Sequence, residues 1–357
     1  MGQRVAVISS GNGGQSMAAY LAIKGFEVSL YAREQERVDM FSSNHFQLSG
    51  EVNGEADLRL ISCDMEKVLE GAGVVLVTTP AQYHPAVAKA MAPFLVDGQL
   101  VVLNPGRTLG TYVFDKTLRE NGLKGRIILA ETETFLFTCR CITPGYPILY
   151  AIKHDVKLAA HDPANTPQAV ERMGQLFPSI LPAGSVFETG LANIGMIFHP
   201  LPILMNITRV EAKEGFHFYT EGISPLVANI LQRMDAERVA VAQAVGAQVL
   251  PATQWLKLHY GSTGDDLYSC IQSTDAYQDV LAPTDIDTRY IYEDIQTGCV
   301  PFSCMAKAVG VPTPIIDSVI QWATAVYDYD FYGQGRNEHM LDLNQLIQDV
   351  RLQTGGT

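Results

Sequence analysis

Paired cysteine motifs are absent from this sequence. Its 357 residues include six cysteines, and none of them forms the CxxC pairs that bind zinc. A chain of this length also needs no disulfide framework to stabilise its core. Cys139 and Cys141 lie close together, and thiols buried in a strand or loop are the simpler interpretation of that spacing. We therefore expect no metal site, and a protein of the reducing cytoplasm.

Positive charge and long apolar runs are also scarce. Lys and Arg number 25 against 38 Asp and Glu, which gives a formal net charge of −13. Nucleic acids and anionic membranes attract clusters of Lys and Arg, so neither is an expected partner, whereas a small anionic substrate needs only a few local arginines. The apolar stretch 193–206 is broken by His199, Pro200 and Pro202 and is too short to span a membrane. Residues 1–8 show no signal-peptide pattern.

Residues 4–31 follow the order strand, glycine turn, helix, strand. This order turns the weak GxGxxG match at the turn into evidence for a dinucleotide site, because glycines let the backbone approach a pyrophosphate at the start of a helix. Ser16 stands where a third glycine or alanine is usual, and it is small enough for close packing. An unrelated α/β turn is the simpler alternative. The expected cofactor-binding residues of the turn are Gly11, Asn12, Gly13 and Gly14.

The end of the second strand distinguishes the two nicotinamide cofactors. An Asp or Glu there accepts a hydrogen bond from the ribose of NAD, whereas the 2′-phosphate of NADP needs a cation. Ala32 occupies the acidic position and Arg33 follows it, which favours NADP. Glu34 keeps NAD open.

Three further buried strands continue the same class of fold, within 73–80, 98–103 and 126–132. The segment 146–161 alternates as edge strands extending the sheet would. The sequence therefore predicts a Rossmann-type doubly wound parallel sheet, in which loops at the carboxyl ends of the strands form the ligand crevice. The polar residues expected at this crevice, each with plain loop capping as its alternative, are Thr79, Asn104, Glu131 and Thr132.

Helical spacing replaces the strand pattern in the second half. Apolar residues recur at helical intervals in a segment beginning near Pro225, and further helices are expected over 252–260, 289–309 and 313–327. We predict a dinucleotide-binding domain over 1–183 and an all-helical substrate domain over 184–357. The cleft between two such domains is the usual place for a substrate.

His199 is the strongest candidate for acid/base chemistry. It lies in an apolar helical stretch that two prolines disturb, and Asn206 follows about two turns later on the same face, as a candidate for substrate binding. A histidine there could exchange protons near neutral pH. A core histidine at a kink is the alternative.

The segment 285–301 supplies a second constellation. Arg289 could hold a substrate carboxylate with its planar guanidinium, and Asp294 could orient His199. Five residues span about 500° of helix, so Arg289 and Asp294 do not share a face of a regular helix. An ordinary ion pair between Arg289 and Glu293, one turn apart, is the alternative.

Several motifs together resemble one family. The glycine turn is followed in order by LNPGRTLG, ETETFLFTCR, NIGMIFHPLPILMN, FHFYTEGISPLVANILQRMDAERVAVAQAVG and DTRYIYEDIQTGCVPFSCMAKAVGVPTPIID. This series resembles the opine dehydrogenases, which include octopine and nopaline dehydrogenases, and in particular the bacterial N-(1-carboxyethyl)-amino acid dehydrogenases. The resemblance extends through nearly the whole chain.

The resemblance implies a reaction and roles for its residues. Family members join an amino acid to an α-keto acid, typically pyruvate, and reduce the imine with NAD(P)H to a secondary amine dicarboxylate. It implies an acid/base role for His199, a supporting role for Asp294, and a carboxylate contact for Arg289. Close relatives carry an Asn one turn before the histidine, where this chain has Gly195, which puts the amine specificity in question. Asn193 lies about 120° from the His199 face of a regular helix.

Two other functions remain open at this point. A ketopantoate reductase-like or 2-hydroxyacid-forming enzyme would need no amine, but such enzymes generally use a lysine for which no matching context exists here. A regulator that senses NADP would bind the cofactor without chemistry. Small-molecule substrates and a homodimer are the expected partners.

Overall fold

The computed structural model describes residues 3–354. The chain divides into two compact units, Met1–Gly190 and Leu191–Thr357. The predicted domain boundary after residue 183 falls earlier, just before helix α7 (Val186–Leu191), and the assignment of 1–183 and 184–357 as functional domains stays a prediction. Within the described part of the chain, no helix is both long enough and apolar enough to cross a membrane.

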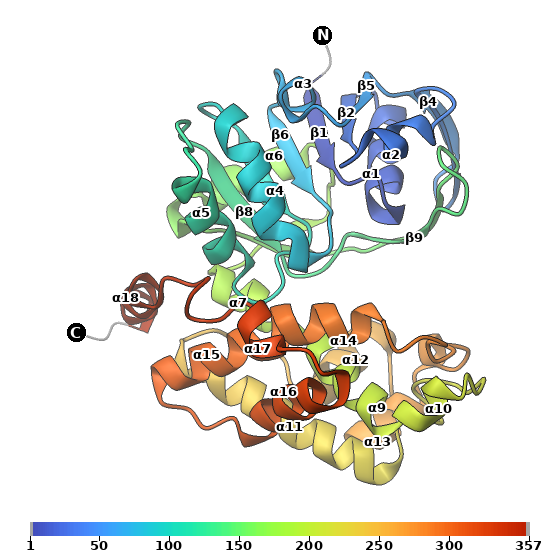
Figure 1. Ribbon diagram of the computed structural model, residues 1–357, viewed down its shortest axis with the longest axis vertical. Helices are drawn as coiled ribbons and strands as arrows, with labels where there is room; N and C mark the ends of the chain where they lie inside the picture. The colour runs from blue at the N-terminus through green and yellow to red at the C-terminus, as the bar shows by residue number, and fades with distance from the viewer. Residues whose placement is uncertain (1–2, 355–357) are drawn as a thin grey trace. The chain divides into compact units, whose positions relative to one another are not determined.

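The first unit contains the predicted Rossmann-type sheet (Figure 1). Its eight strands have the order β12-β11-β8-β7-β6-β1-β2-β5. All neighbours pair in parallel except β11 and β8, which are antiparallel. The predicted fold class is therefore confirmed. The strands are β1 (Arg4–Ile8), β2 (Glu27–Tyr31), β5 (Leu60–Ser62), β6 (Val74–Val77), β7 (Leu100–Leu103), β8 (Ile128–Thr132), β11 (Val156–Ala160) and β12 (Ile180–Pro182).

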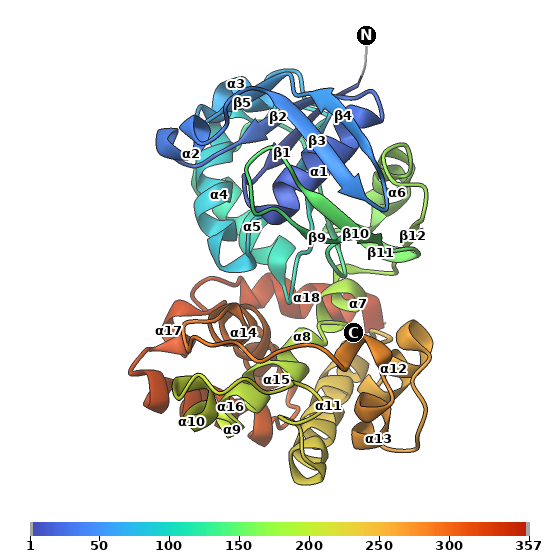
Figure 2. The same cartoon turned by 90° about the vertical axis from the view of Figure 1, so that its right-hand side faces the viewer.

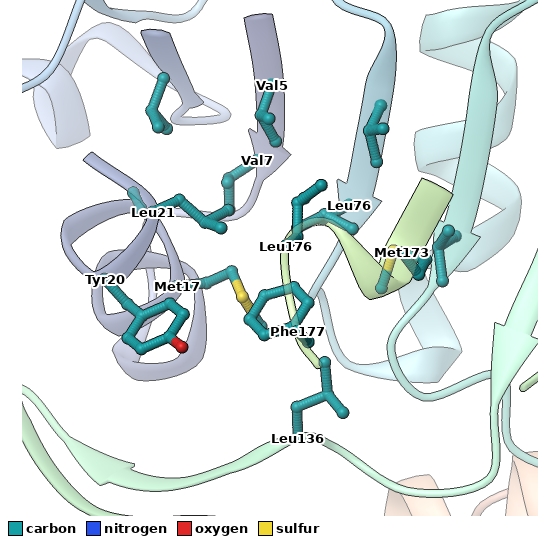
Figure 3. Close-up of a cluster of buried hydrophobic side chains, with 14 of the residues drawn as sticks. Val5, Val7, Met17, Tyr20, Leu21, Leu76, Leu136, Met173, Leu176 and Phe177 are labelled. Atoms are coloured by element: carbon teal, nitrogen blue, oxygen red, sulfur yellow. The ribbon is translucent and has the colours of Figure 1, made fainter. Parts of the chain in front are cut away.

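Both faces of this sheet are covered by helices. In β1, Val5 and Val7 belong to one buried apolar cluster, which Figure 3 shows, and Ala6 and Ile8 belong to another. Alternate residues of a strand point to opposite faces, so this division places one cluster on each face of the sheet. Helices α1 (Asn12–Ile23) and α6 (Thr166–Gly174) supply the first cluster, and α3 (Met65–Leu69), α4 (His84–Met91) and α5 (Gly110–Glu120) supply the second.

A second sheet, of four strands, corrects one prediction. The segment 146–161 was expected to extend the main sheet, but only β11 does so. Strand β10 instead pairs antiparallel with β9 and parallel with β3, in a sheet that covers α1 (Figure 2). The reason is that Leu149 is buried while Tyr150 is exposed, a one-sided strand that suits a sheet with one solvated face. The strands are β3 (His45–Gly50), β4 (Gly54–Asp57), β9 (Phe137–Arg140) and β10 (Ile148–Ile152).

The second unit is helical, as predicted. Ser224 caps the first turn of its longest helix, α11, by accepting a hydrogen bond from Val227 N. The expected helix over 289–309 begins and ends at those residues but contains a π-helical turn over Ile295–Cys299. The helices are α8 (Gly195–Phe198), α9 (Pro200–Met205), α10 (Ile207–Glu211), α11 (Pro225–Ala244), α12 (Ala252–Tyr260), α13 (Leu267–Gln272), α14 (Arg289–Asp294), α15 (Val300–Val309), α16 (Pro314–Tyr327), α17 (Phe331–Gln334) and α18 (Leu343–Thr354).

A buried ion pair on α11 joins separate parts of this unit. Arg238, whose side chain is 1% exposed, donates to Asp235, to Leu191 O and to Leu250 O. Asp235 in turn accepts from Ala252 N at the start of α12. Each charge therefore has several hydrogen-bond partners, which offsets the cost of removing both from water.

Gly14 allows α1 to approach the end of β1. A Cβ at this position would lie 1.8 Å from Ser9 O, whereas one at Gly174, on α6, would meet nothing within 4 Å. We expect Gly14→Ala to lower the free energy of unfolding by about 1–3 kcal/mol, because the helix must shift against backbone. Gly174→Ala is the matched control and should change it by less than about 1 kcal/mol. Urea unfolding followed by circular dichroism measures both, and equal stabilities would contradict the assigned contact.

Candidate active site

A pocket of about 410 Å³ lies beside the glycine turn in the first unit. Three of the predicted cofactor residues line it: Gly11, Arg33 and Thr79. Asn12 lines a neighbouring pocket of about 120 Å³, whereas Gly13, Gly14 and Asn104 line neither of the two. The larger pocket is completed by Ser9, Ser10, Tyr31, Glu34, Arg37, Tyr83, Ala86, Val87 and Ala90.

The glycine turn leads directly into α1. Gly11 is the N-cap and provides no side-chain hydrogen bond to the first turn, so backbone N–H groups there can bind an anion. Ser16 is fully buried, and its hydroxyl donates to Asn12 O at 2.9 Å. The substitution at the usual third glycine position is thus accommodated inside the helix.

Charged groups at the end of β2 border the same pocket. The Arg33 Nε donates to Glu34 Oε1 at 2.9 Å, and both side chains are exposed. Arg37, one turn into α2 (Gln35–Asp39), lines the pocket with them. The cation that favours NADP and the carboxylate that favours NAD are therefore adjacent and bonded to each other.

Two polar atoms among the predicted crevice residues fit a bound ligand. Thr79 Oγ1 and Asn104 Nδ2 are buried and have no hydrogen-bond partner among residues 3–354. The Asn104 oxygen accepts from Thr132 Oγ1 at 3.0 Å, so this pair orders the loop after β7. Glu131 is buried and accepts from Thr111 N and Thr189 Oγ1. Glu131 and Thr132 thus serve as loop supports, the alternative left open for them, while Thr79 and Asn104 retain atoms that a dinucleotide could satisfy.

In the second unit, His199 lies at a break between two short helices. Its backbone (φ −112°, ψ −62°) joins the end of α8 to the start of α9. Pro200 disfavours helical geometry at the residue before it, and Pro202 cannot donate a backbone hydrogen bond. The His-Pro sequence thus makes the helix irregular at His199, although His199 N still donates to Gly195 O and His199 O accepts from Ile203 N.

Asp294 holds one nitrogen of this imidazole. Its Oδ2 lies 2.8 Å from His199 Nδ1, and the side chains are 3% and 19% exposed. A carboxylate there accepts the Nδ1 hydrogen, which leaves Nε2 as the nitrogen that exchanges protons. Asp294 is the last residue of α14, immediately before the π-helical turn, a feature often found at functional sites.

Two tyrosines enclose the same ring. Tyr290, one turn before Asp294, stacks on the imidazole with centroids 4.0 Å apart and planes 8° from parallel. The Tyr219 hydroxyl lies 3.4 Å from Nε2. Burial raises the pKa of Tyr219 well above its ordinary value, and burial likewise raises that of Tyr290. Both phenols therefore remain protonated at neutral pH.

Arg289 makes the ion pair that was the alternative to its predicted role. Its Nε donates to Glu293 Oε2 at 2.7 Å, and its side chain is 65% exposed while that of Glu293 is buried. On this helix, Glu293 contacts Arg289 and Asp294 contacts His199. Arg289 and Asp294 therefore lie on different faces, as the rotation of about 100° per residue predicts.

Asn206 makes structural contacts through its side-chain amide. Its amide donates to Pro202 O and to Gly222 O, which tie the end of α9 to a later loop. His199 is the N-cap of α9 and Asn206 its C-cap, so the two residues lie at opposite ends of one short helix. Gly195 begins α8, and its carbonyl accepts from His199 N. Asn193 lies outside both helices, so the regular-helix angle computed for it does not apply.

Neither Tyr219 nor Tyr290 was predicted from the sequence to be a site residue. Tyr290 could have been found, because it lies four residues before Asp294 and shares its helix face. Tyr219 comes from an irregular segment with no periodicity, so no local signal relates it to His199.

A Rossmann-type sheet with a pocket at its glycine turn, followed by a helical unit with a His–Asp pair, defines the class of two-domain NAD(P)-dependent oxidoreductases.

Comparison with known proteins identifies the family within this class. Residues 182–327 match the family described as NAD/NADP octopine/nopaline dehydrogenase, alpha-helical domain, and residues 4–107 match the NAD-dependent glycerol-3-phosphate dehydrogenase N-terminus. The opine dehydrogenase of Arthrobacter sp. (strain 1C) is 36% identical, over 96% of this chain and 95% of its own. The chain belongs to the opine dehydrogenase family, as its motifs predicted.

Solved structures share the fold. An octopine dehydrogenase bound to NADH and L-arginine superposes with a TM-score of 0.80 at 23% identity, covering 99% of this chain and 98% of that one. A yersinopine dehydrogenase bound to NADP⁺ gives 0.75 at 12% identity, with the same coverage.

Asp294→Asn should keep the site's shape while removing the charge beside Nδ1. We expect kcat to fall by roughly 10³–10⁴, because an amide can hold the imidazole in the wrong tautomer and cannot stabilise its protonated form. Asp285→Asn, an exposed carboxylate of the preceding segment, is the control and should retain full activity. Steady-state kinetics with NADPH measures both, and a loss below tenfold in Asp294→Asn would contradict this role.

Proposed function

We propose that this protein catalyses the NAD(P)H-dependent reductive condensation of an amino acid with an α-keto acid to an N-(carboxyalkyl) amino acid, and the reverse oxidation. Membership of the opine dehydrogenase family supports the reaction class. The observation that carries the assignment to this site is the 2.8 Å contact between His199 Nδ1 and Asp294. It leaves Nε2 as a proton-exchange atom in a nearly buried position.

Nε2 of His199 has two successive tasks in this reaction. It first accepts a proton from the substrate ammonium, which frees the amine lone pair to attack the keto carbon. It then returns the proton to the hydroxyl of the carbinolamine, so that the C–O bond breaks, water leaves, and the nitrogen lone pair forms the C=N bond. Asp294 stabilises the imidazolium between these steps.

The groups of the first unit would hold the cofactor. The glycine turn and the first turn of α1 suit the pyrophosphate, and Thr79 Oγ1 and Asn104 Nδ2 are buried donors that need acceptors. When bound, the nicotinamide supplies the hydride that reduces the C=N bond.

The reaction is tested by NADPH oxidation with pyruvate, with and without a pool of L-amino acids. Oxidation that requires both substrates is the expected result, and oxidation with the keto acid alone would replace this proposal with a hydroxyacid-forming reductase. His199→Ala should lower kcat by about 10²–10⁴. Its Kd for NADPH, from fluorescence titration, should equal that of the wild type, because His199 contributes acid/base chemistry and not cofactor affinity.

We also propose that NADP is the preferred cofactor, with Arg33 and Arg37 as ligands of its 2′-phosphate. Both arginines line the pocket beside the glycine turn, and the position of the acid typical of NAD sites is Ala32. Glu34 bonds to Arg33 and supports NAD as a second cofactor.

The double variant Arg33→Ala, Arg37→Ala separates the two cofactors. We expect kcat/KM for NADPH to fall about 10–100-fold, because charge-assisted hydrogen bonds to the phosphate are lost. The value for NADH should change less than about threefold. Arg119→Ala, on an exposed face of α5, is the control. Equal losses with both cofactors would show that these arginines do not read the 2′-phosphate.

Roles of the remaining predicted residues follow from their contacts. We propose that Arg289 binds the keto-acid carboxylate by exchanging its partner Glu293 for the substrate, and that Arg289→Ala raises KM for that substrate. We also propose that Gly195, buried at the start of α8, contacts the amino acid substrate. Asn206 contributes by fixing the end of α9, since its amide is bonded to backbone.

Pyruvate as the keto acid, a homodimer and a cytoplasmic location complete the proposal. The absence of paired cysteine motifs from the sequence supports a reducing compartment. A molar mass of twice the chain mass, measured by light scattering, would establish the dimer.

A further inference from the structure

The imidazole of His199 is contacted from three sides by side chains of two other segments. Asp294 takes Nδ1, and Tyr290 from the same helix covers a ring face. The remaining nitrogen, Nε2, faces the Tyr219 hydroxyl at 3.4 Å. Nε2 is also the atom at which the proposed reaction moves its proton.

The structure fixes Tyr219 firmly at this position. Phe216 and Phe218, which both precede it in sequence, are fully buried, and Phe218 N donates to Val280 O at 2.7 Å. The Tyr219 ring stacks on Tyr277 with centroids 3.9 Å apart and planes 12° from parallel. The hydroxyl is therefore held near Nε2, because its ring and the segment just before it are anchored.

Proton exchange at Nε2 changes what this nitrogen needs. In the neutral imidazole Nε2 is an acceptor, whereas in the imidazolium it carries a hydrogen that must be donated. His199 is nearly buried, so a nitrogen left without a partner in either state costs free energy. A phenol hydroxyl can both donate and accept, which a carboxylate or an ammonium cannot do at neutral pH.

We propose that Tyr219 is a positioning residue that serves Nε2 of His199 in both protonation states, donating to the neutral imidazole and accepting from the imidazolium. Tyr219 keeps its own proton throughout, and only its O–H direction changes. The inference rests on the proposed acid/base role of His199 and adds to it a partner for the proton-exchange nitrogen.

The environment of Tyr219 suits this task. Burial, with smaller contributions from Tyr277, Tyr290, Tyr260 and Asp294, raises its pKa well above the ordinary value. Tyrosinate is therefore not formed, and the hydroxyl is present whenever the imidazole needs it. The 3.4 Å separation is long for a hydrogen bond, and catalytic hydrogen bonds commonly tighten when substrate is bound.

Tyr219→Phe removes this hydroxyl and keeps the ring. We expect kcat to fall about tenfold, because the Nε2 hydrogen of the imidazolium loses its acceptor. KM for both substrates and the Kd for NADPH should stay within about twofold. The matched control is Tyr277→Phe, which removes the hydroxyl of the stacked, equally buried neighbour and should leave kcat unchanged.

Isotope effects separate this role from a structural one. In Tyr219→Phe the solvent deuterium effect on kcat should rise and the effect of deuterated NADPH should fall, since proton transfer at Nε2 becomes slower relative to hydride transfer. A general loosening of the site would lower kcat without that opposite change. Equal kcat values for Tyr219→Phe and Tyr277→Phe would overturn the proposal.

A spectroscopic measurement tests the contact independently of turnover. With ¹⁵N-labelled histidine, and His199 assigned from a His199→Gln sample, the resonance of neutral Nε2 should move downfield in Tyr219→Phe and stay in place in Tyr277→Phe. An unmoved resonance in Tyr219→Phe overturns the inference even if the condensation is confirmed. A moved resonance in a protein that condenses no substrates would retain the contact and reject the proposed function. If Tyr219→Phe does not fold, the wild-type spectrum is sufficient by itself. A neutral Nε2 that accepts no hydrogen bond has a distinct downfield resonance, and finding it there would overturn the inference.

Discussion

The helical unit depends on a charge that has been taken out of water. Arg238 lies inside α11 and bonds to Asp235 and to two backbone carbonyls, one at each of two chain segments that adjoin that helix. Backbone carbonyls at segment ends have no helical partner, so the guanidinium satisfies groups that would otherwise be buried without one. Removing either partner would leave an uncompensated charge in the core. The pair thus connects α11 with the end of α7 and the start of α12.

In the site, the side chains around His199 fix the orientation of its imidazole and thereby leave Nε2 as the atom that exchanges protons. His199 is held at Nδ1 by a carboxylate, on one face by Tyr290 and at Nε2 by Tyr219, so a ring with ordinary rotational freedom is restricted to one orientation. A net charge of −13 would repel an anionic cofactor and anionic substrates at long range, but that repulsion is screened within about 10 Å at moderate salt. Recognition of such ligands then depends on local cations such as Arg33 and Arg37.

Residues whose neighbours in space are also neighbours in sequence could be predicted. The order of strand, glycine turn, helix and strand over residues 4–31 was predicted, and so were α11 and α12, from periodicity and turn residues. The pairing of β10 could not be predicted, because a short alternating strand fits either sheet. One of its partners, β3, is distant in sequence, and an irregular loop separates β10 from the other, β9. The contact of Tyr219 with His199 is likewise long-range. Arg289 illustrates a different limit: the sequence offered two partners for it, and the structure shows that it contacts Glu293.

The π-helical turn after Asp294 amounts to one extra residue in an otherwise continuous helix. Each residue of an α-helix turns the chain by about 100°, so α14 and α15 are related by a rotation that a regular helix would not give. This rotation decouples the orientations of two helix faces. One is the face of α15 that packs in the core, and the other is the face of α14 that carries Asp294 and Tyr290. A single-residue deletion within Ile295–Cys299 would restore regular winding and turn Asp294 away from His199 while leaving every residue of the pair in the sequence. Chain length in this turn is thus as much a part of the site as the identity of its side chains.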